Sequence, residues 1–419
     1  MTRVIEWIVS LLIVIALFVV IGLFLPASRT VSHSVETNRP MSTVNDILSS
    51  FTRFKDWNAL INHDPRMQLT TSGPESGVGA ALAFSSSQHS IGSGKWEIKE
   101  IVPGEKIVYA LDTPGRGTNK TMTFHFERTG QRNQNIEITQ RYSVDYGYDL
   151  LGRYAGTLYV NSEVGADIKR GLTKLSNLLA TIPRFDYSQH EPGFEVAELP
   201  AQNVLLVTTA AKRANDDIAL AMTNQRKWID QVMEKNDLEP AGPMRIVTNE
   251  FGSDTYAFDV VMPIRRKGTG PAEAADAAEG EAAEAVAEAT PAPAADPNAP
   301  LETFEVEVEG PVVYAQLPAM RVAKSSYTGP SPGLARIRDL VRAWALVRGH
   351  EPTDRPFEEY LGEIKDMLAE DAEFNVYWPV RVPGVDAAAP RVIAPLPEDE
   401  AAEPAPAAAE AAEAEAAAA

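Results

Sequence analysis

The chain has 419 residues, of which 44% are hydrophobic, with no cysteine and a formal net charge of −20. At roughly 150 residues per domain, this length suggests two or three domains. The lack of cysteine excludes disulfides, thiolate nucleophiles and zinc–cysteine sites. No basic patch with interleaved aromatic residues is present, which argues against nucleic acid as a partner. The six histidines are scattered without an i,i+4 pair, so we predict no metal and no cofactor.

Most of the negative charge lies in two low-complexity stretches. Residues 271–300 contain seven acidic residues and no basic one, and residues 386–419 contain eight acidic residues and one basic one. Segments of this composition cannot bury enough apolar surface to offset the entropy lost on ordering. We therefore predict a disordered acidic insert at 268–300 and a disordered acidic tail at 383–419.

Residues 4–25 are almost entirely apolar, with Glu6 as the only charge. A helix that spans a bilayer needs about 20 such residues. The run is longer than the apolar region of a signal peptide, and no A-x-A-like cleavage site follows it. We predict an uncleaved single-pass anchor in a bacterial inner membrane, with the bilayer as partner. The flanking charge bias is weak and leaves the orientation open; the short N-terminal flank favours soluble domains on the non-cytoplasmic side.

A first soluble domain is predicted at residues 29–183. Period-two alternation indicates strands, and apolar residues at helical spacing indicate a long closing helix at 161–181. One or two short helices are expected between 41 and 57. The implied fold is α+β, a curved antiparallel sheet wrapped around the closing helix. The predicted strands cover residues 30–37, 78–84, 95–102, 107–112, 121–127 and 135–144.

This order of elements resembles the START-like (SRPBCC) superfamily, which includes polyketide cyclase/dehydrase and lipid-transport domains. The residues that carry the resemblance are Val31 to Pro40, Phe51 to Trp57 and Ile168 to Leu172. The resemblance implies an apolar cavity between sheet and helix, in a superfamily that contains both enzymes and carriers. Each candidate lining residue could instead fill the core; the candidates are Trp57, Phe84, Trp96, Phe124, Phe126 and Tyr142.

A second soluble domain, residues 195–382, contains an internal repeat. Tyr256 to Arg265 aligns with Glu373 to Arg381, and an amphipathic helix lies before each copy, at 216–234 and 333–348. A strand precedes each helix, at 203–208 and 312–326. Two copies of strand–helix–strand–strand predict a pseudo-twofold α+β domain.

The repeat resembles the gyrase-inhibitor-like domain, the effector-binding module of AraC-type and multidrug-responsive regulators. The matching segments are Tyr327 to Pro330, Pro356 to Leu361 and Phe374 to Val380. The resemblance implies that Glu358 lies in a central pocket and meets cationic or polar groups of lipophilic ligands, with Tyr360 beside it.

The residue types agree with that role. Residues two apart on a strand share a face, so Glu358 and Tyr360 project together, and a carboxylate backed by aromatic rings attracts a lipophilic cation. The alternative is a solvated glutamate on an edge strand, which we expect for Glu359. The first copy places Arg245 at the position of Glu358, so the site is expected to be asymmetric. Candidate pocket walls, equally suited to a core, are Trp344, Tyr377 and Trp378.

No catalytic residue is predicted. Gly329 to Gly333 matches the G-x-S-x-G motif, but Pro332 lacks the backbone N–H that an oxyanion hole needs. Ser331 is better explained as a helix cap. Three functions stay open. The chain could be a non-enzymatic, membrane-anchored binder of small amphipathic or lipophilic molecules, cationic ones included. It could instead be an enzyme of cyclase, hydratase or hydrolase type that uses one of the two cavities, or an envelope structural protein whose cavities are filled by side chains. The first is our leading hypothesis.

Overall fold

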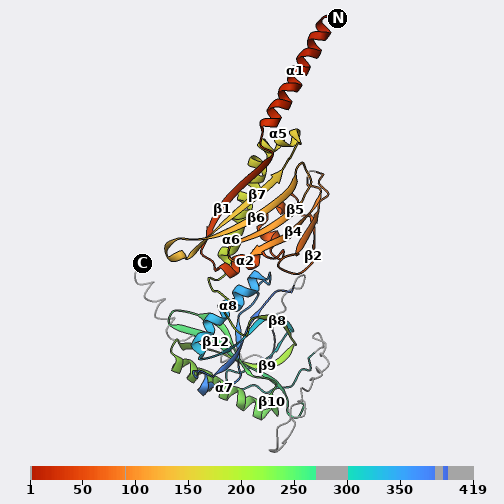
Figure 1. Ribbon diagram of the computed structural model, residues 1–419. Helices are drawn as coiled ribbons and strands as arrows, with labels where there is room; N and C mark the ends of the chain where they lie inside the picture. The colour runs from red at the N-terminus through yellow and green to blue at the C-terminus, as the bar shows by residue number, and fades with distance from the viewer. Residues whose placement is uncertain (1, 90, 270–300, 383–389, 395–419) are drawn as a thin grey trace, which may run out of the picture. The chain divides into compact units, whose positions relative to one another are not determined.

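The computed structural model describes residues 2–89, 91–269, 301–382 and 390–394 (Figure 1). The predicted disordered stretches at 270–300, 383–389 and 395–419 lie outside these residues. Within the predicted tail, Arg391–Ala394 forms strand β17, which pairs with β13 (Val313–Leu317), so the prediction of disorder is wrong there. The chain divides into two compact units, residues 1–191 with 342–350, and residues 192–341 with 351–419.

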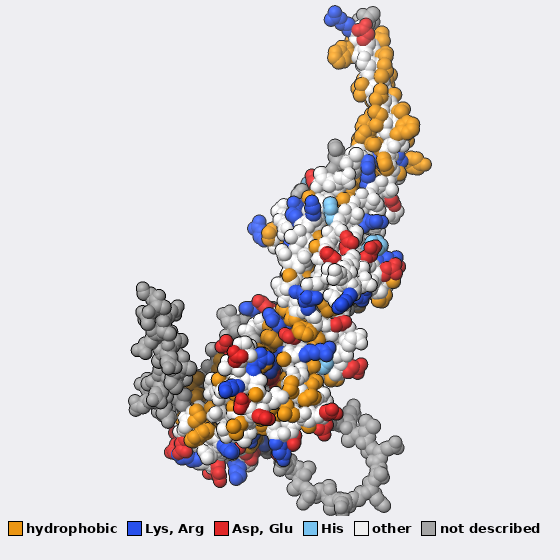
Figure 2. Space-filling view, turned by 90° about the vertical axis from the view of Figure 1, so that its left-hand side faces the viewer, with side chains coloured by type: hydrophobic (Ala, Val, Ile, Leu, Met, Phe, Trp, Pro, Cys, Tyr) orange, Lys and Arg blue, Asp and Glu red, His pale blue; other side chains and the backbone are white. Residues whose placement is uncertain are grey.

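The N-terminal helix α1 (Thr2–Phe24) is apolar apart from its first residues, which include Arg3 and Glu6. Among the described residues, it is the one helix long and apolar enough to cross a membrane, with a mean hydropathy of 3.1. Figure 2 shows hydrophobic side chains along its length. This length and hydropathy are those expected of the predicted span at 4–25, and its location in a membrane stays a prediction.

Unit 1 contains a seven-stranded antiparallel sheet in the order β1-β7-β6-β5-β4-β3-β2. Strand β2 has no predicted counterpart, because its mostly exposed sequence QLTTS lacks an alternating apolar face. The strands are β1 (Ser28–Thr37), β2 (Gln68–Ser72), β3 (Ala81–Ser85), β4 (Ser93–Val102), β5 (Lys106–Asp112), β6 (Thr118–Thr129) and β7 (Asn135–Asp145).

The closing helix begins eleven residues before its predicted start and has three parts. These are α5 (Leu150–Tyr159), a π-helical turn η2 (Val160–Val164) and α6 (Gly165–Thr181), which lies against the sheet (Figure 1). Asp149 begins the helix, because its carboxylate accepts a hydrogen bond from the N–H of Gly152 at 3.0 Å. The other helices of this unit are α2 (Met41–Leu48), α3 (Phe54–Trp57) and α4 (Leu60–His63), with a 3₁₀ turn η1 (Gln131–Asn133).

Unit 2 contains a ten-stranded antiparallel sheet. Its order is β17-β13-β9-β12-β11-β15-β16-β14-β8, and β10 pairs with β12. The remaining strands are β8 (Glu195–Leu199), β9 (Gln202–Lys212), β10 (Leu238–Pro240), β11 (Met244–Phe251), β12 (Thr255–Arg266), β14 (Met320–Thr328), β15 (Phe357–Tyr360) and β16 (Glu373–Pro379). Its helical elements are α7 (Asn215–Lys235), η3 (Ser331–Gly333), α8 (Leu334–Val347) and η4 (Ile364–Asp366), with the C-terminal part of α8 grouped with unit 1.

The duplication is visible in the strand order. Strands β9-β12-β11 on one side are mirrored by β15-β16-β14 on the other, so the two copies meet where β11 pairs with β15. In each copy the helix follows the first strand, α7 after β9 and α8 after β14. Two local predictions need correction. The strand predicted at 312–326 is interrupted after Leu317, where Pro318 follows. The turn η3 begins at Ser331 with Pro330 as its cap residue, and no side chain caps it.

Candidate functional site

Unit 1 encloses a cavity of about 830 Å³. Ligand cavities in proteins usually have volumes of about 300–1,000 Å³. The walls come from the segment 57–63, from strands β3 to β7, and from α5, η2 and α6. This is the space that the predicted arrangement of a sheet around a helix would enclose.

One wall of the cavity is aromatic and closed to solvent. Trp57, Phe84 and Trp96 line it and are buried. Tyr142 also lines the cavity, but it is half-buried and packs against Val144, Tyr146 and Val160. The rings are held from behind: Phe54 meets Trp96 edge-to-face with 5.3 Å between ring centroids. Two other predicted contacts, Phe124 and Phe126, lie in the core instead, and Phe124 meets Trp57 edge-to-face with 5.6 Å between ring centroids.

Buried polar atoms accompany this aromatic wall. Gln140 on β7 is 4% exposed; its Nε2 donates to Sδ of Met122 at 3.3 Å, while its Oε1 has no hydrogen-bond partner. The indole Nε1 atoms of Trp57 and Trp96 also have none. Since buried polar groups almost always find a partner, these side chains of the cavity wall can serve an occupant with both donor and acceptor groups.

Lys120 also lines the cavity, but its ammonium is committed to the backbone. Its Nζ donates to the carbonyl oxygens of Thr113 at 2.6 Å, Pro114 at 3.1 Å and Gly115 at 3.0 Å. A lysine has three N–H donors, so all three are used to close the β5–β6 turn. Burial lowers the pKa of Lys120. We therefore regard Lys120 as a structural part of the wall.

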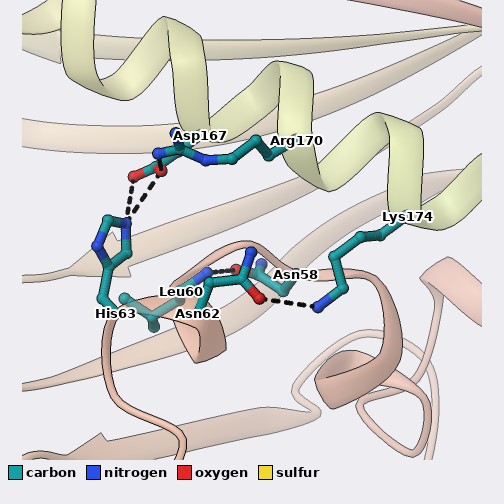
Figure 3. A network of polar contacts seen from close by, with 7 residues as sticks. All are labelled: Asn58, Leu60, Asn62, His63, Asp167, Arg170 and Lys174. Carbon is teal, nitrogen blue, oxygen red and sulfur yellow. Dashed lines mark hydrogen bonds and ion pairs between the residues drawn. The ribbon is translucent and has the colours of Figure 1, made fainter.

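A charged cluster on the cavity lining stays exposed (Figure 3). The Nε2 atom of His63 lies 3.0 Å from each carboxylate oxygen of Asp167, and Arg170 pairs with the same carboxylate. All three side chains are at least one-third exposed. Figure 3 shows Asp167 pointing from α6 toward His63, with the Arg170 side chain extending toward Asp167. The cavity thus has a buried aromatic end and an exposed charged rim.

In unit 2, Glu358 lies at the centre of the sheet on β15, between β11 and β16. Its side chain is fully buried, at 0% exposure, and accepts a hydrogen bond on Oε1 from Nε of Arg338 on α8. Its Oε2 has no hydrogen-bond partner. Burial raises the pKa of Glu358, against the opposing effect of the Arg338 charge. Glu358 therefore has no solvent-accessible surface in this conformation.

Tyr360 is buried on the same face of β15, and burial raises the pKa of its hydroxyl. It also borders a shallower hollow of about 480 Å³, which α7 and the segment around η4 enclose. The inward orientation predicted for Glu358 and Tyr360 therefore agrees with the structure, and their role as ligand contacts stays a prediction.

The expectation of a solvated Glu359 on an edge strand is wrong. Glu359 is buried on the opposite face of β15, where Arg245 pairs with it at 3.0 Å and the hydroxyl of Tyr377 donates to it at 2.7 Å. Arg245 and Glu359 are directly opposed in the β11–β15 register. Arg245 is therefore not on the face of Glu358, although the repeat alignment placed it at the equivalent position.

The remaining predicted wall residues are dispersed. Tyr377 is on the face of Glu359, away from Glu358, because Phe357 is its cross-strand neighbour. Trp378 is half-buried on the other face of β16, which is the face of Glu358. Trp344 is half-buried on α8, in the part that groups with unit 1, with its ring 6.1 Å from that of His350. Tyr377 and Trp344 therefore do not share a site with Glu358, whereas Trp378 lies on its face.

Sequence reasoning missed Arg338, Gln140 and the pair His63–Asp167. Gln140 carried a usable signal, because it shares one face of its strand with Ile136, Ile138 and Tyr142. A polar residue therefore occupies one position of a row that faces inward. The other three carried none, because their partners are more than fifteen residues away along the chain. In the described residues, no group of three or more acidic or histidine side chains is placed to hold a metal ion.

Comparisons with known proteins give one match to a family model and similarities to solved structures. Residues 28–180 match the family model described as polyketide cyclase / dehydrase and lipid transport. The crystal structure of the EcmrR C-terminal domain is similar over 45% of this chain and 96% of its own, at 14% identity and a TM-score of 0.31. Truncated norcoclaurine synthase from Thalictrum flavum is similar over 35% of this chain and 92% of its own, at 15% identity and a TM-score of 0.28. No curated protein matches the sequence.

Proposed function

We propose that this chain is a membrane-anchored protein that binds a small amphipathic molecule in the cavity of unit 1. The observation that carries the proposal is the polarity of that cavity, which has a buried aromatic end at Trp57, Phe84 and Trp96 and an exposed charged rim at His63, Asp167 and Arg170. Burial of an apolar tail among the rings gains about 25 cal/mol per Å². The rim leaves a polar head in contact with charge and water.

Further support comes from the match of residues 28–180 to a family described by cyclase, dehydrase and lipid-transport activity. Each of these activities requires a bound small molecule. The anchor rests on α1, which is long and apolar enough to span a bilayer. The proposed location is a bacterial inner membrane, with the soluble units on its non-cytoplasmic side.

Native mass spectrometry of the full chain, purified from its host in detergent, tests the binding proposal. A non-covalent adduct is expected on the wild type. Ala166→Phe, at a cavity-lining position of α6, should abolish the adduct. Ala180→Phe makes the same change at an exposed position of the same helix and should retain it. A bare wild-type protein, or an adduct equally present in both variants, would contradict the proposal.

An enzyme is the second candidate, favoured by the contact between His63 and Asp167 at the cavity rim. An imidazole oriented by a carboxylate is an arrangement used for general acid–base catalysis. If this reading is right, the recovered molecule will be chemically converted by the wild type, and His63→Gln will retain the adduct but lose the conversion. If wild type and His63→Gln leave it equally unchanged, the protein is a carrier.

For unit 2, we propose a secondary site for lipophilic cations around Glu358 and Tyr360, with Trp378 on the same face. The support is the inward carboxylate with one unpaired oxygen. A hydrolase that uses Glu358 and Tyr360 is less consistent with the geometry, because Glu358 is closed to solvent and held by Arg338. A ligand cation would have to replace the guanidinium.

A further inference from the structure

Helix α5 is fixed to the C-terminal end of the membrane helix. The Nη1 atom of Arg153 donates to the carbonyl oxygens of Gly22 at 3.3 Å, Leu23 at 3.1 Å and Leu25 at 3.0 Å. The carbonyls of Gly22 and Leu23 belong to the last turn of α1, and that of Leu25 directly follows it, where the helix supplies no further N–H donors. The hydroxyl of Tyr154 donates to the carbonyl oxygen of Phe18 at 2.8 Å.

This contact is close and includes side chains. The ring of Tyr154 stacks on that of Phe18, with 4.4 Å between centroids and 14° between planes. Gly22 permits the approach, because a Cβ atom there would lie 3.2 Å from the Tyr154 ring and 3.3 Å from Leu150. Arg153 also donates to the carbonyl oxygen of Gly147 at 2.8 Å, so the same side chain links the segment before α5 to the C-terminal end of α1.

The length of α1 sets the depth of α5. The apolar stretch Arg3–Phe24 has 22 residues, and a hydrocarbon core of about 30 Å requires about 20 residues. The C-terminal turn of α1 therefore lies at the membrane interface. Phe18, which α5 reaches, is about 9 Å further inward at 1.5 Å per residue. Helices that lie in the interface are buried to a similar depth, about 5–10 Å.

The surface of α5 is suited to that position. Leu151, Ala155 and Tyr159 lie at i, i+4 and i+8 and form one exposed stripe, in which Leu151 is 54% and Tyr159 52% exposed. Tyr148, just before the helix, is 91% exposed. Tyrosine is enriched at membrane interfaces, and the helix sequence LLGRYAGTLY contains no acidic residue.

The same stripe belongs to the cavity lining. Ala155 and Tyr159 line the 830 Å³ cavity together with Gly156 and the following π-helical turn. One helix therefore contacts the anchor, exposes an apolar stripe and borders the cavity.

We propose that the stripe of Leu151, Ala155 and Tyr159 is a docking surface for the lipid bilayer itself, and that the cavity of unit 1 opens onto the membrane along α5. An amphipathic ligand then passes between bilayer and cavity without crossing bulk water. This inference rests on the proposed anchor and on the proposed binding of an amphipathic molecule.

The absence of cysteine makes site-specific labelling direct. Single cysteines at Ile13, Leu151 and Gln131 in the full chain would carry a bimane fluorophore, and the protein would be reconstituted into phosphatidylcholine vesicles with nitroxide lipids. Gln131, in the β6–β7 turn, is the matched control, because it lies at the end of β7 that is far from α1. The other end, at Asp145, is near α1, since the N–H of Tyr146 donates to the carbonyl oxygen of Ala27 at 2.7 Å. The length of β7 separates the two ends by about 33 Å. Nitroxides deep in the acyl chains should quench position 13, head-group nitroxides should quench position 151, and neither should quench position 131.

The outcomes separate the two levels of the proposal. If position 13 is quenched and position 151 is not, the bilayer contact of α5 is refuted while the anchor stands. If position 13 is not quenched, the anchor and the contact both fail. Equal quenching at 151 and 131 also refutes the contact, because it would be unspecific.

Transfer of an anthroyloxy-labelled fatty acid from vesicles to the full chain tests the passage. Leu151→Glu places a charge in the proposed interface and should slow the transfer about tenfold. Val78→Glu, at an exposed apolar residue of the β2–β3 connection, should leave the rate unchanged. Equal rates in both variants would overturn the membrane passage, and no uptake by the wild type would overturn it together with the proposed binding of an amphipathic molecule.

Discussion

The guanidinium of Arg338 donates to Oε1 of Glu358, and Oε2 of the same carboxylate has no hydrogen-bond partner. Glu358, which the sequence predicts to bind a cationic ligand, is therefore paired with the positively charged Arg338 of the same chain. The bond joins α8 to the central strand β15. A ligand that takes the place of Arg338 would release α8 from this strand, so occupancy and helix position would be coupled.

Arg338→Met should destabilise the protein by about 3–5 kcal/mol near neutral pH, because it leaves a buried carboxylate unpaired. Burial already raises the pKa of Glu358, and the loss of Arg338 raises it further. A raised folded-state pKa contributes stability that is present in acid and is lost as the pH rises through that pKa. The deficit should therefore shrink from pH 7.5 to pH 5 in thermal unfolding of the detergent-solubilised chain. A second substitution, Glu358→Gln, should restore stability near neutral pH; a deficit independent of pH would argue against this account.

Tyr377→Phe should destabilise the protein by about 1–3 kcal/mol, the cost of a lost hydrogen bond to a buried charged group. Its hydroxyl serves Glu359 and not a ligand, so retention of a bound molecule should not change. Tyr327→Phe is the control, since its hydroxyl bonds the carbonyl oxygen of Pro330 in an exposed setting. Chemical denaturation would measure both. If Tyr377→Phe lost the bound molecule without losing stability, Tyr377 would instead be a ligand contact in the pocket wall.

Gln140→Leu should leave the melting temperature unchanged or raise it, because it removes a buried oxygen that has no hydrogen-bond partner in the protein. The same change should weaken binding of the fatty-acid probe about tenfold, which corresponds to about 1.4 kcal/mol. Fluorescence titration and differential scanning calorimetry test the two effects. Unchanged affinity would mean that the ligand does not reach Gln140.

Gly156→Ala should cost about 1–3 kcal/mol through overpacking, because its Cβ would lie 2.4 Å from the ring of Tyr146. Gly171→Ala provides a comparison in α6: its Cβ would meet the nearest atom at 3.5 Å, an ordinary contact. That variant should be stabilised by up to about 1 kcal/mol, as expected for alanine in a helix interior. Unfolding curves that show the same sign for both variants would refute the close fit of Tyr146 on α5.

Periodicity predicted most of the fold, because most elements bury one face. The closing helix shows this in α6, where Ile168, Leu172, Leu175 and Leu179 form a buried stripe. Helix α5 escaped prediction for the opposite reason. Leu151 and Tyr159 are exposed, and the glycines of α5 meet Tyr146, so no apolar row points to a single core.

In the candidate sites, the sequence predicted at most one of the two residues of each contact. Glu358 was identified through the resemblance of the segment Pro356 to Leu361 to the gyrase-inhibitor-like domain, and Tyr360 two residues further along the strand agreed with that role. Its partner could not be found, since α8 offers Arg336, Arg338 and Arg342 within one short stretch and nothing along the chain distinguishes them. Glu359 was assigned to solvent because β15 looks like an edge strand until β11 from the other copy pairs with it.

The π-helical turn at Val160–Val164 sets the angular phase between α5 and α6. A π turn holds one residue more than an α turn, and each residue of an α-helix advances by about 100°. A single-residue deletion that converts this turn to α-helix would rotate α5 by roughly that angle while leaving α6 seated on the sheet. Arg153 and Tyr154 would then face away from Phe18 and Gly22. The number of residues in this helix, more than their identity, therefore sets how the apolar helix α1 is oriented relative to the domain that contains the cavity.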